Sequence, residues 1–317
     1  ANLRATNPLP LLTALGLPSS VMPAGVLVLD GTLAKPRDEP LKAAFAGRLG
    51  QTDIGFDGTL DDTGKIAANV SAGSLFARDI LAAALMEWNG QQPSPETPFA
   101  AGLPFGLTGE VWITPKELKV SDIYSAKNVQ AAISATEGEL RVAIFGKDDE
   151  GRDALIEIAS KPDGEAGRRV IDGKIVLPVE LARQLRLETG EAVASGSGVI
   201  DVSFKGSGRS PGGTLTGLSG SGSYRIEGLE VARIDVPAFK RAAASASDGE
   251  GLTAAFEALR AGGALALGDA SGSITIVNGV AALSPIRNST ADADARVTSI
   301  AELGQGTIDT SIILTIR

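Results

Sequence analysis

The sequence contains neither cysteine nor histidine. The absence of cysteine excludes disulfides, thiolate metal sites and cysteine nucleophiles. The absence of histidine removes the commonest general base and the commonest transition-metal ligand, so a Ser-His-Asp mechanism is impossible within this chain. We therefore expect no metal and no cofactor.

Aromatic side chains are scarce, at 4% of the 317 residues, although 43% of the residues are hydrophobic. The apolar content comes mainly from Ala, Leu, Val and Ile, and 39 residues are Gly. This mixture is typical of many short strands joined by tight turns. Its apolar fraction argues against disorder, and its length suits one large or two ordinary domains.

Positive charge is not concentrated anywhere, because the 29 Lys and Arg residues are scattered and the net charge is −9. A nucleic-acid-binding protein needs a basic face, so we expect no nucleic-acid partner. The first residues lack the pattern of a signal peptide, and no stretch approaches the roughly 18 apolar residues of a membrane helix. We expect the chain to be a segment of a longer protein whose anchor and targeting signals lie elsewhere.

Alternation of apolar and polar residues with a period of two dominates the chain. It places Ile133 on one side of its strand, and it does the same for Val142 with Ile144 and for Ile200, Val202 and Phe204. Short turn signals such as "DDTG" and "KDDEG" separate many of these runs. The pattern predicts a mainly β fold, an elongated and curved antiparallel meander sheet that forms an open groove, with a few short helices at its edges or end.

Helical patterns are fewer, and composition indicates soft boundaries between three parts of the chain. We expect units at 1–100, 101–204 and 205–317, and short helices at about 8–16, 78–88, 179–189 and 236–262. The Gly, Ser and Pro content of 205–223 predicts a long loop there.

The stretch 235–247 is predicted to be a helix that covers the end or edge of the sheet. Asp235 is placed to accept hydrogen bonds from the first turn, and Pro237 fits there because it has no N–H. Phe239 is the large apolar residue of this helix, so we expect it to face inward and to supply most of the docking energy.

Several motifs suggest chemistry but lack the residues that would complete it. "GRSPG" places Ser210 in the pattern of a nucleophile elbow, but that site needs histidine, so we interpret it as a solvated loop. The carboxylate clusters "DD" at 61–62 and "DDE" at 148–150 are interpreted as solvated turn charges, and a weak cation site at "DAD" (292–294) stays open. Trp88 and Trp112 are assigned to core packing.

The stretch "LSGSGSYRIEGLEVARIDVPAFKRAA", followed by "GDASGSITIVNGVAALSPI", resembles the C-terminal region of AsmA-like proteins. Taken together, the two segments follow the family's order. The first contains a glycine-punctuated strand, an Ile-Asp step and a short helix, and the second contains a strand that ends in Asn-Gly. The resemblance covers residues 100–317 well and 1–100 loosely. The matching positions are Gly220, Gly222, Ile226, Ile234, Asp235, Ser271, Ser273, Ile274, Ile276, Asn278 and Gly279.

The resemblance implies a periplasmic protein of double-membraned bacteria whose parent chain is anchored in the inner membrane. Members of the family are associated with phospholipid movement to the outer membrane and with outer-membrane assembly, and they carry no catalytic residues. The expected partners are phospholipid and components of the inner and outer membranes. The resemblance also implies that the chain is not an enzyme.

A mechanism without an active site is consistent with both the alternation and the resemblance. A sheet with one apolar face can hold acyl chains in place of a second layer of core, at about 0.8 kcal/mol per buried CH₂. We expect six residues to line such a groove: Ile133, Val142, Ile144, Ile200, Val202 and Phe204. The alternatives are a β-scaffold or adhesin-type passenger domain with a dry core and, less favoured, a hydrolase that uses carboxylates.

Overall fold

The structure is a computed structural model, and it divides the chain into two compact units. Unit 1 comprises Ala1–Ile175 with Ser203–Leu218, and unit 2 comprises Val176–Val202 with Ser219–Arg317. The residues that the structure describes are 2–5, 27–49, 52–87, 94–103, 106–121, 124–148, 150–186, 189–289 and 293–317.

The prediction of a mainly β meander is confirmed. Within the described residues, sixteen strands follow one another in chain order as hydrogen-bonded neighbours, from β1 to β16. A few short helices interrupt this series. None of these helices combines the length and the apolar character that a bilayer-spanning helix needs.

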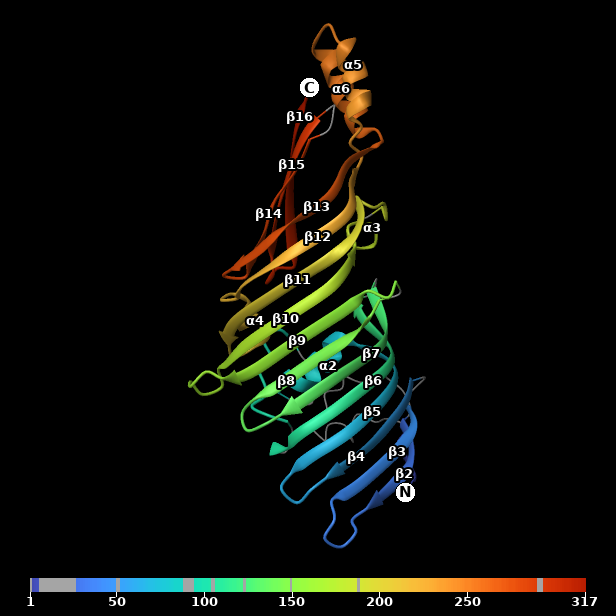
Figure 1. The fold of residues 1–317 in the computed structure, drawn as a ribbon, viewed down its shortest axis with the longest axis vertical. Coiled ribbons are helices and arrows are strands. Elements are labelled where there is room, and N and C mark those ends of the chain that lie inside the picture. The colour runs from blue at the N-terminus through green and yellow to red at the C-terminus, as the bar shows by residue number, and fades with distance from the viewer. Residues whose placement is uncertain are drawn as a thin grey trace. The chain divides into compact units, whose positions relative to one another are not determined.

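The described part of unit 1 contains the first nine strands, parts of two more and two helices (Figure 1). Its elements are β1 (Asn2–Ala5), β2 (Leu27–Ala34), β3 (Leu41–Leu49), β4 (Thr52–Leu60), β5 (Lys65–Phe76), α2 (Ala77–Leu85), β6 (Thr108–Ser121), β7 (Tyr124–Ala135), β8 (Leu140–Lys147), β9 (Asp153–Pro162), the first part of β10 (Arg169–Glu180), the last part of β11 (Ala194–Gly208) and α4 (Pro211–Leu215).

The connection between β5 and β6 differs from a hairpin, because these two strands pair in parallel. A parallel pair needs a crossover that passes over the sheet, and α2 lies in that crossover. The helix lies against β5, β6 and β8, and Figure 1 shows it behind the sheet. It buries Ile80 and Leu85 with the alanines of the same side, so it supplies a second layer to this part of the sheet.

A buried cation ties several segments of unit 1 together. Arg169 donates to Ser160 Oγ at 3.0 Å and to the carbonyl oxygens of Ser160 and Gly138 at 2.8 and 2.6 Å. It also donates to the Ala101 carbonyl at 3.4 Å. Burial lowers the pKa of this guanidinium. Four carbonyl and hydroxyl contacts offset the desolvation of its charge.

The described part of unit 2 contains the remaining strands, the short helix α3 and the helix pair α5 and α6 (Figure 1). Its elements are the last part of β10, α3 (Leu181–Gln184), the first part of β11, β12 (Ser219–Ala232), α5 (Val236–Ala244), α6 (Gly249–Arg260), β13 (Ala264–Val277), β14 (Val280–Ser289), β15 (Ala293–Glu302) and β16 (Thr307–Ile316).

One face of the sheet in unit 2 is apolar, and its residues on β12 and β13 are buried. Tyr224 and Ile226 of β12 are buried, as are Ile274 and Ile276 of β13. Tyr224 lies directly opposite Gly272, where a Cβ atom would be 2.6 Å from the tyrosine hydroxyl. The glycine therefore lets the ring cross β13, and the hydroxyl donates to the Ser284 carbonyl of β14 at 2.9 Å.

Several local expectations need correction. The loop expected over 205–223 is instead the end of β11, the helix α4 and the start of β12, because Ser210 caps a helical turn between the two strands. The helix expected at 179–189 is limited to Leu181–Gln184. The boundary expected at 204 falls inside β11, close to the point where unit 2 ends at Val202 and unit 1 resumes at Ser203.

The other helices agree with the sequence patterns where the structure describes them. The helix expected at 78–88 is α2, and the helical region expected at 236–262 is the pair α5 and α6. The helix expected at 8–16 lies outside the described residues.

Candidate functional site

Three of the predicted groove residues lie together in unit 1. Ile133 of β7 is directly opposite Val142 of β8, and Ile144 is two residues further along β8 on the same face. All three are buried, and Val142 is only 1% exposed. Because α2 packs against this part of the sheet, an acyl chain could reach these residues only if α2 moved.

The other three predicted residues alternate along β11 and are half-buried. Ile200 and Val202 belong to unit 2, whereas Phe204 belongs to unit 1. The Phe204 ring occupies the space beside Gly173 of β10, where a Cβ atom would lie 2.2 Å from Cζ of the ring. Phe204 thus packs on a backbone that only glycine leaves uncovered.

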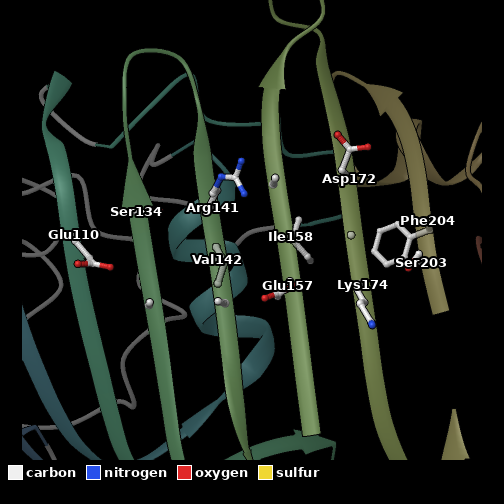
Figure 2. Close-up of a pocket in the computed structure, with 14 residues that line it drawn as sticks. Glu110, Ser134, Arg141, Val142, Glu157, Ile158, Asp172, Lys174, Ser203 and Phe204 are labelled. Atoms are coloured by element: carbon white, nitrogen blue, oxygen red, sulfur yellow. The ribbon is translucent and has the colours of Figure 1, made fainter. Parts of the chain in front are cut away.

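A hollow of about 540 Å³ lies in unit 1, and Figure 2 shows the side chains around it in front of α2. Its lining comes from six neighbouring strands, β6 to β11. The lining residues are Glu110, Ala132, Ser134, Arg141, Val142, Ala143, Glu157, Ile158, Ala159, Asp172, Gly173, Lys174, Ser203 and Phe204.

The hollow follows from the sizes of the side chains on the polar face of the sheet. Ala132, Ala143 and Glu157 form one row across β7, β8 and β9, because the strand register places them opposite one another. The next row carries Arg141 with Ala159. The small alanine side chains therefore form the base of the hollow, and longer charged side chains surround it.

Charges of both signs surround the hollow, and some are paired. Arg141 Nε lies 2.5 Å from Glu139 Oε1, and Lys205 Nζ lies 3.6 Å from Asp172 Oδ1. The Lys205–Asp172 pair is largely solvent-exposed and adds little stability, whereas the Glu139 side chain is only 25% exposed. Among the residues that the structure describes, no cluster of acidic side chains could hold a metal ion. The hollow offers contacts for a polar or zwitterionic group.

Ser210, the residue of the "GRSPG" motif, has a structural role. It is buried, and its Oγ accepts a hydrogen bond from the Gly213 N–H at 3.2 Å as the N-cap of α4. A strand-to-helix turn is present, so the expectation of a solvated loop is wrong. The chain nevertheless has no histidine to activate this hydroxyl.

The acidic turns also have structural explanations. Although burial pushes the pKa of Asp148 upward, hydrogen bonds from the backbone and side chain of Arg152 hold it below its ordinary value. Asp61 accepts hydrogen bonds from Thr63, which lower its pKa. Trp88, Asp149 and Asp292 lie outside the described residues.

Trp112 has an aromatic neighbour in unit 1, as the assignment to packing requires. Its ring is perpendicular to that of Phe145, with 6.2 Å between the ring centroids. This edge-to-face arrangement is favourable for aromatic pairs.

A second apolar surface, which sequence reasoning did not select, lies on β14 to β16 of unit 2. Val297 and Ile312 are directly opposite each other, and Leu314 lies two residues further along β16. All three are half-buried. In the described part of unit 2, α5 and α6 pack on each other rather than across this face. The alternation in "GTIDTSIILTI" is the signal that could have identified it.

Comparisons with known proteins found no matching protein-family model, no matching curated protein and no matching solved structure.

Proposed function

We propose that this chain is a non-enzymatic, lipid-binding segment of an AsmA-like envelope protein. In this proposal the sheet holds phospholipid acyl chains on an apolar face and so supports lipid transport or outer-membrane assembly. The parent chain would be anchored in the inner membrane and this segment would lie in the periplasm. The resemblance of residues 220–279 to the family is one support, and the character of the sheet is the other.

The observation that carries the proposal is the face of unit 2 formed by β12 to β16. It changes gradually from fully buried residues, such as Ile274, to half-buried ones, such as Ile312. Aliphatic side chains at the half-buried end have one side packed on the sheet and the other side open. Covering such a surface with a further apolar layer is favourable, because it removes apolar area from water.

An acyl chain is a suitable layer for this surface. Each methylene removed from water contributes about 0.8 kcal/mol, so a contact of six methylenes would contribute about 5 kcal/mol before the cost of ordering the chain. The aliphatic residues Val297, Ile312 and Leu314 present no polar atoms to that chain. A head group could stay in water at the open edge, and no specific polar pocket would be needed.

A structural scaffold is the second candidate, and one observation favours it. In unit 1, α2 covers the apolar face of β5, β6 and β8, which gives that region a dry core without any lipid. If unit 2 also has no bound lipid, the whole segment would act as a scaffold. A hydrolase that depends on carboxylates is the least favoured alternative.

The test is lipid content with a matched pair of variants. Ile312 and Ile313 are neighbours on β16 and point to opposite faces, and Ile313 is 59% exposed. We expect the purified chain to carry phospholipid in near-stoichiometric amounts by mass spectrometry, and Ile312→Asp to lose most of it. Ile313→Asp should retain it. Lipid-free wild-type protein, or equal lipid in the two variants, would contradict the proposal.

A further inference from the structure

The helices α5 and α6 form a hairpin that is inserted between β12 and β13 at one end of the strands in unit 2 (Figure 1). Ala232 and Ala264 are paired at its base. There the Arg233 N–H donates to the Gly263 carbonyl at 3.0 Å, and the Asp235 N–H donates to the Leu259 carbonyl at 2.8 Å. The hairpin is thus fixed at its base to the ends of two strands.

The two helices pack on each other. Phe239 of α5 contacts Phe256 of α6, with 5.3 Å between the ring centroids. Only Val236 of α5 and Ala255 of α6 are buried. The expectation that Phe239 docks a helix onto the sheet is therefore wrong, because its aromatic partner is the neighbouring helix.

Helix α6 carries two large apolar side chains that stay about half exposed, although one of them, Phe256, also contacts Phe239. Leu252 is 48% exposed and Phe256 is 53% exposed. They are four residues apart, so they lie on one side of the helix, and Arg260 continues the same row. Glu257 is turned by about 100° from Phe256, so this carboxylate does not interrupt the row.

Two further exposed apolar residues lie near the base of the hairpin. The Val193 N–H donates to the Leu185 carbonyl at 2.8 Å, and the side chains of both residues are exposed. The Val193 carbonyl accepts from the Ala232 N–H at the base of the hairpin. We call Leu252 and Phe256, the two exposed apolar residues of α6, the end patch.

We propose that the end patch inserts into the interfacial layer of a lipid bilayer. This inference rests on the proposed function, because it supplies the surface from which an acyl chain reaches the sheet. An amphipathic helix with Phe and Leu on one side suits the boundary between head groups and acyl chains.

Two observations favour a membrane over a protein partner. First, the buried positions of the sheet continue to the hairpin, since Val231 and Leu265 are paired and buried next to its base. The apolar interior of the sheet therefore extends as far as the base of the hairpin, where Arg233 forms an ion pair with Glu191.

Second, the hairpin is electrically neutral although the chain carries −9. Between residues 236 and 260, three cations (Lys240, Arg241 and Arg260) balance three carboxylates (Asp248, Glu250 and Glu257). The hairpin is thus not repelled by phosphate groups and does not need anionic lipid, which suits a zwitterionic surface.

Flotation of the 317-residue chain with phosphatidylcholine vesicles tests the proposal. We expect the wild type to float with the vesicles, and Leu252→Ser combined with Phe256→Ser to lower the bound fraction at least tenfold. Val277→Ser is the matched control, because Val277 is equally exposed at the opposite end of β13, and its binding should stay within twofold. No flotation of the wild type, or equal binding by the double variant, would overturn the proposal.

Two further readouts separate the possible explanations. Phe256→Trp keeps a large ring in place, and lipid brominated on its acyl chains should quench its fluorescence. Absence of quenching would overturn insertion even if the serine variants misfold. A concentration-dependent dimer in sedimentation that the double variant abolishes, without flotation, would assign the patch to a second copy.

Membrane insertion of the end patch can be disproved while lipid binding along the sheet still holds. The double variant should still carry phospholipid after purification, whereas Ile312→Asp should float normally but lack it. Lipid content tests binding along the sheet, and flotation tests the end patch.

Discussion

Replacement of Val142 by threonine distinguishes a dry core from an open lipid groove in unit 1. The two side chains have nearly the same shape, so the substitution adds a hydroxyl and leaves little cavity. Val142 is 1% exposed, and its cross-strand neighbours are Ile133 and Ile158. A hydroxyl among these side chains has no side-chain partner, which costs about 1–3 kcal/mol.

The assay is urea unfolding of the delipidated chain, monitored by the fluorescence of Trp112 and Trp88. We expect Val142→Thr to lower the free energy of unfolding by about 2 kcal/mol. Ala143→Ser is the control, because Ala143 is the next residue and borders the polar hollow on the opposite face. Its effect should stay within about 0.5 kcal/mol.

The reasoning fails if the two variants lose equal stability. In that case Val142 would be in contact with water in the lipid-free protein, as in an open groove, and α2 would not cover it. Val142→Asp extends the test. The sequence-based hypothesis expects it to weaken lipid binding, whereas its burial under α2 predicts that it unfolds unit 1 before lipid binding can be measured.

Two further predictions concern the acidic turn of unit 1 and the helical hairpin of unit 2. The Asp148 carboxylate has a pKa held below its ordinary 3.8, so its stabilisation is complete above the unfolded-state pKa and is lost as pH falls through the folded-state value. The difference in unfolding free energy between wild type and Asp148→Asn should therefore be present at pH 7 and shrink below about pH 4. Urea titrations that give an equal difference at both pH values would disprove this role. Phe239→Ala removes an aromatic contact worth about 1 kcal/mol, so amide exchange in α5 should accelerate several-fold. Lys240→Ala should accelerate it less, and identical protection in the two variants would show that the Phe239–Phe256 contact does not hold the hairpin.

The sequence by itself determined the class of the fold and much of its local detail. Alternation with a period of two identified the strands and the residues that share a face, because successive side chains of a strand point to opposite sides whatever the strand packs against. The caps of α5 also follow from local chemistry: Asp235 accepts a hydrogen bond from the Ala238 N–H at 2.8 Å, as its position before Pro237 indicates. Composition alone wrongly predicts a loop over 205–223, because it does not reveal that Ser210 caps a helix and that glycines fit where strands pack closely.

Only the tertiary structure decided what lies on each face. Ile133 and Val142 have the same alternation as Val297 and Ile312, yet the first pair is buried beside α2 and the second pair is half-buried at the end of the sheet. The difference arises from a crossover helix between two parallel strands, more than forty residues away in sequence from Ile133 (133 against 77–85). The alternation of apolar and polar residues is a local property, and it indicates only that one face of a strand is apolar. Whether a helix, a neighbouring strand or a bound lipid covers that face depends on long-range packing, which no short stretch of the sequence encodes.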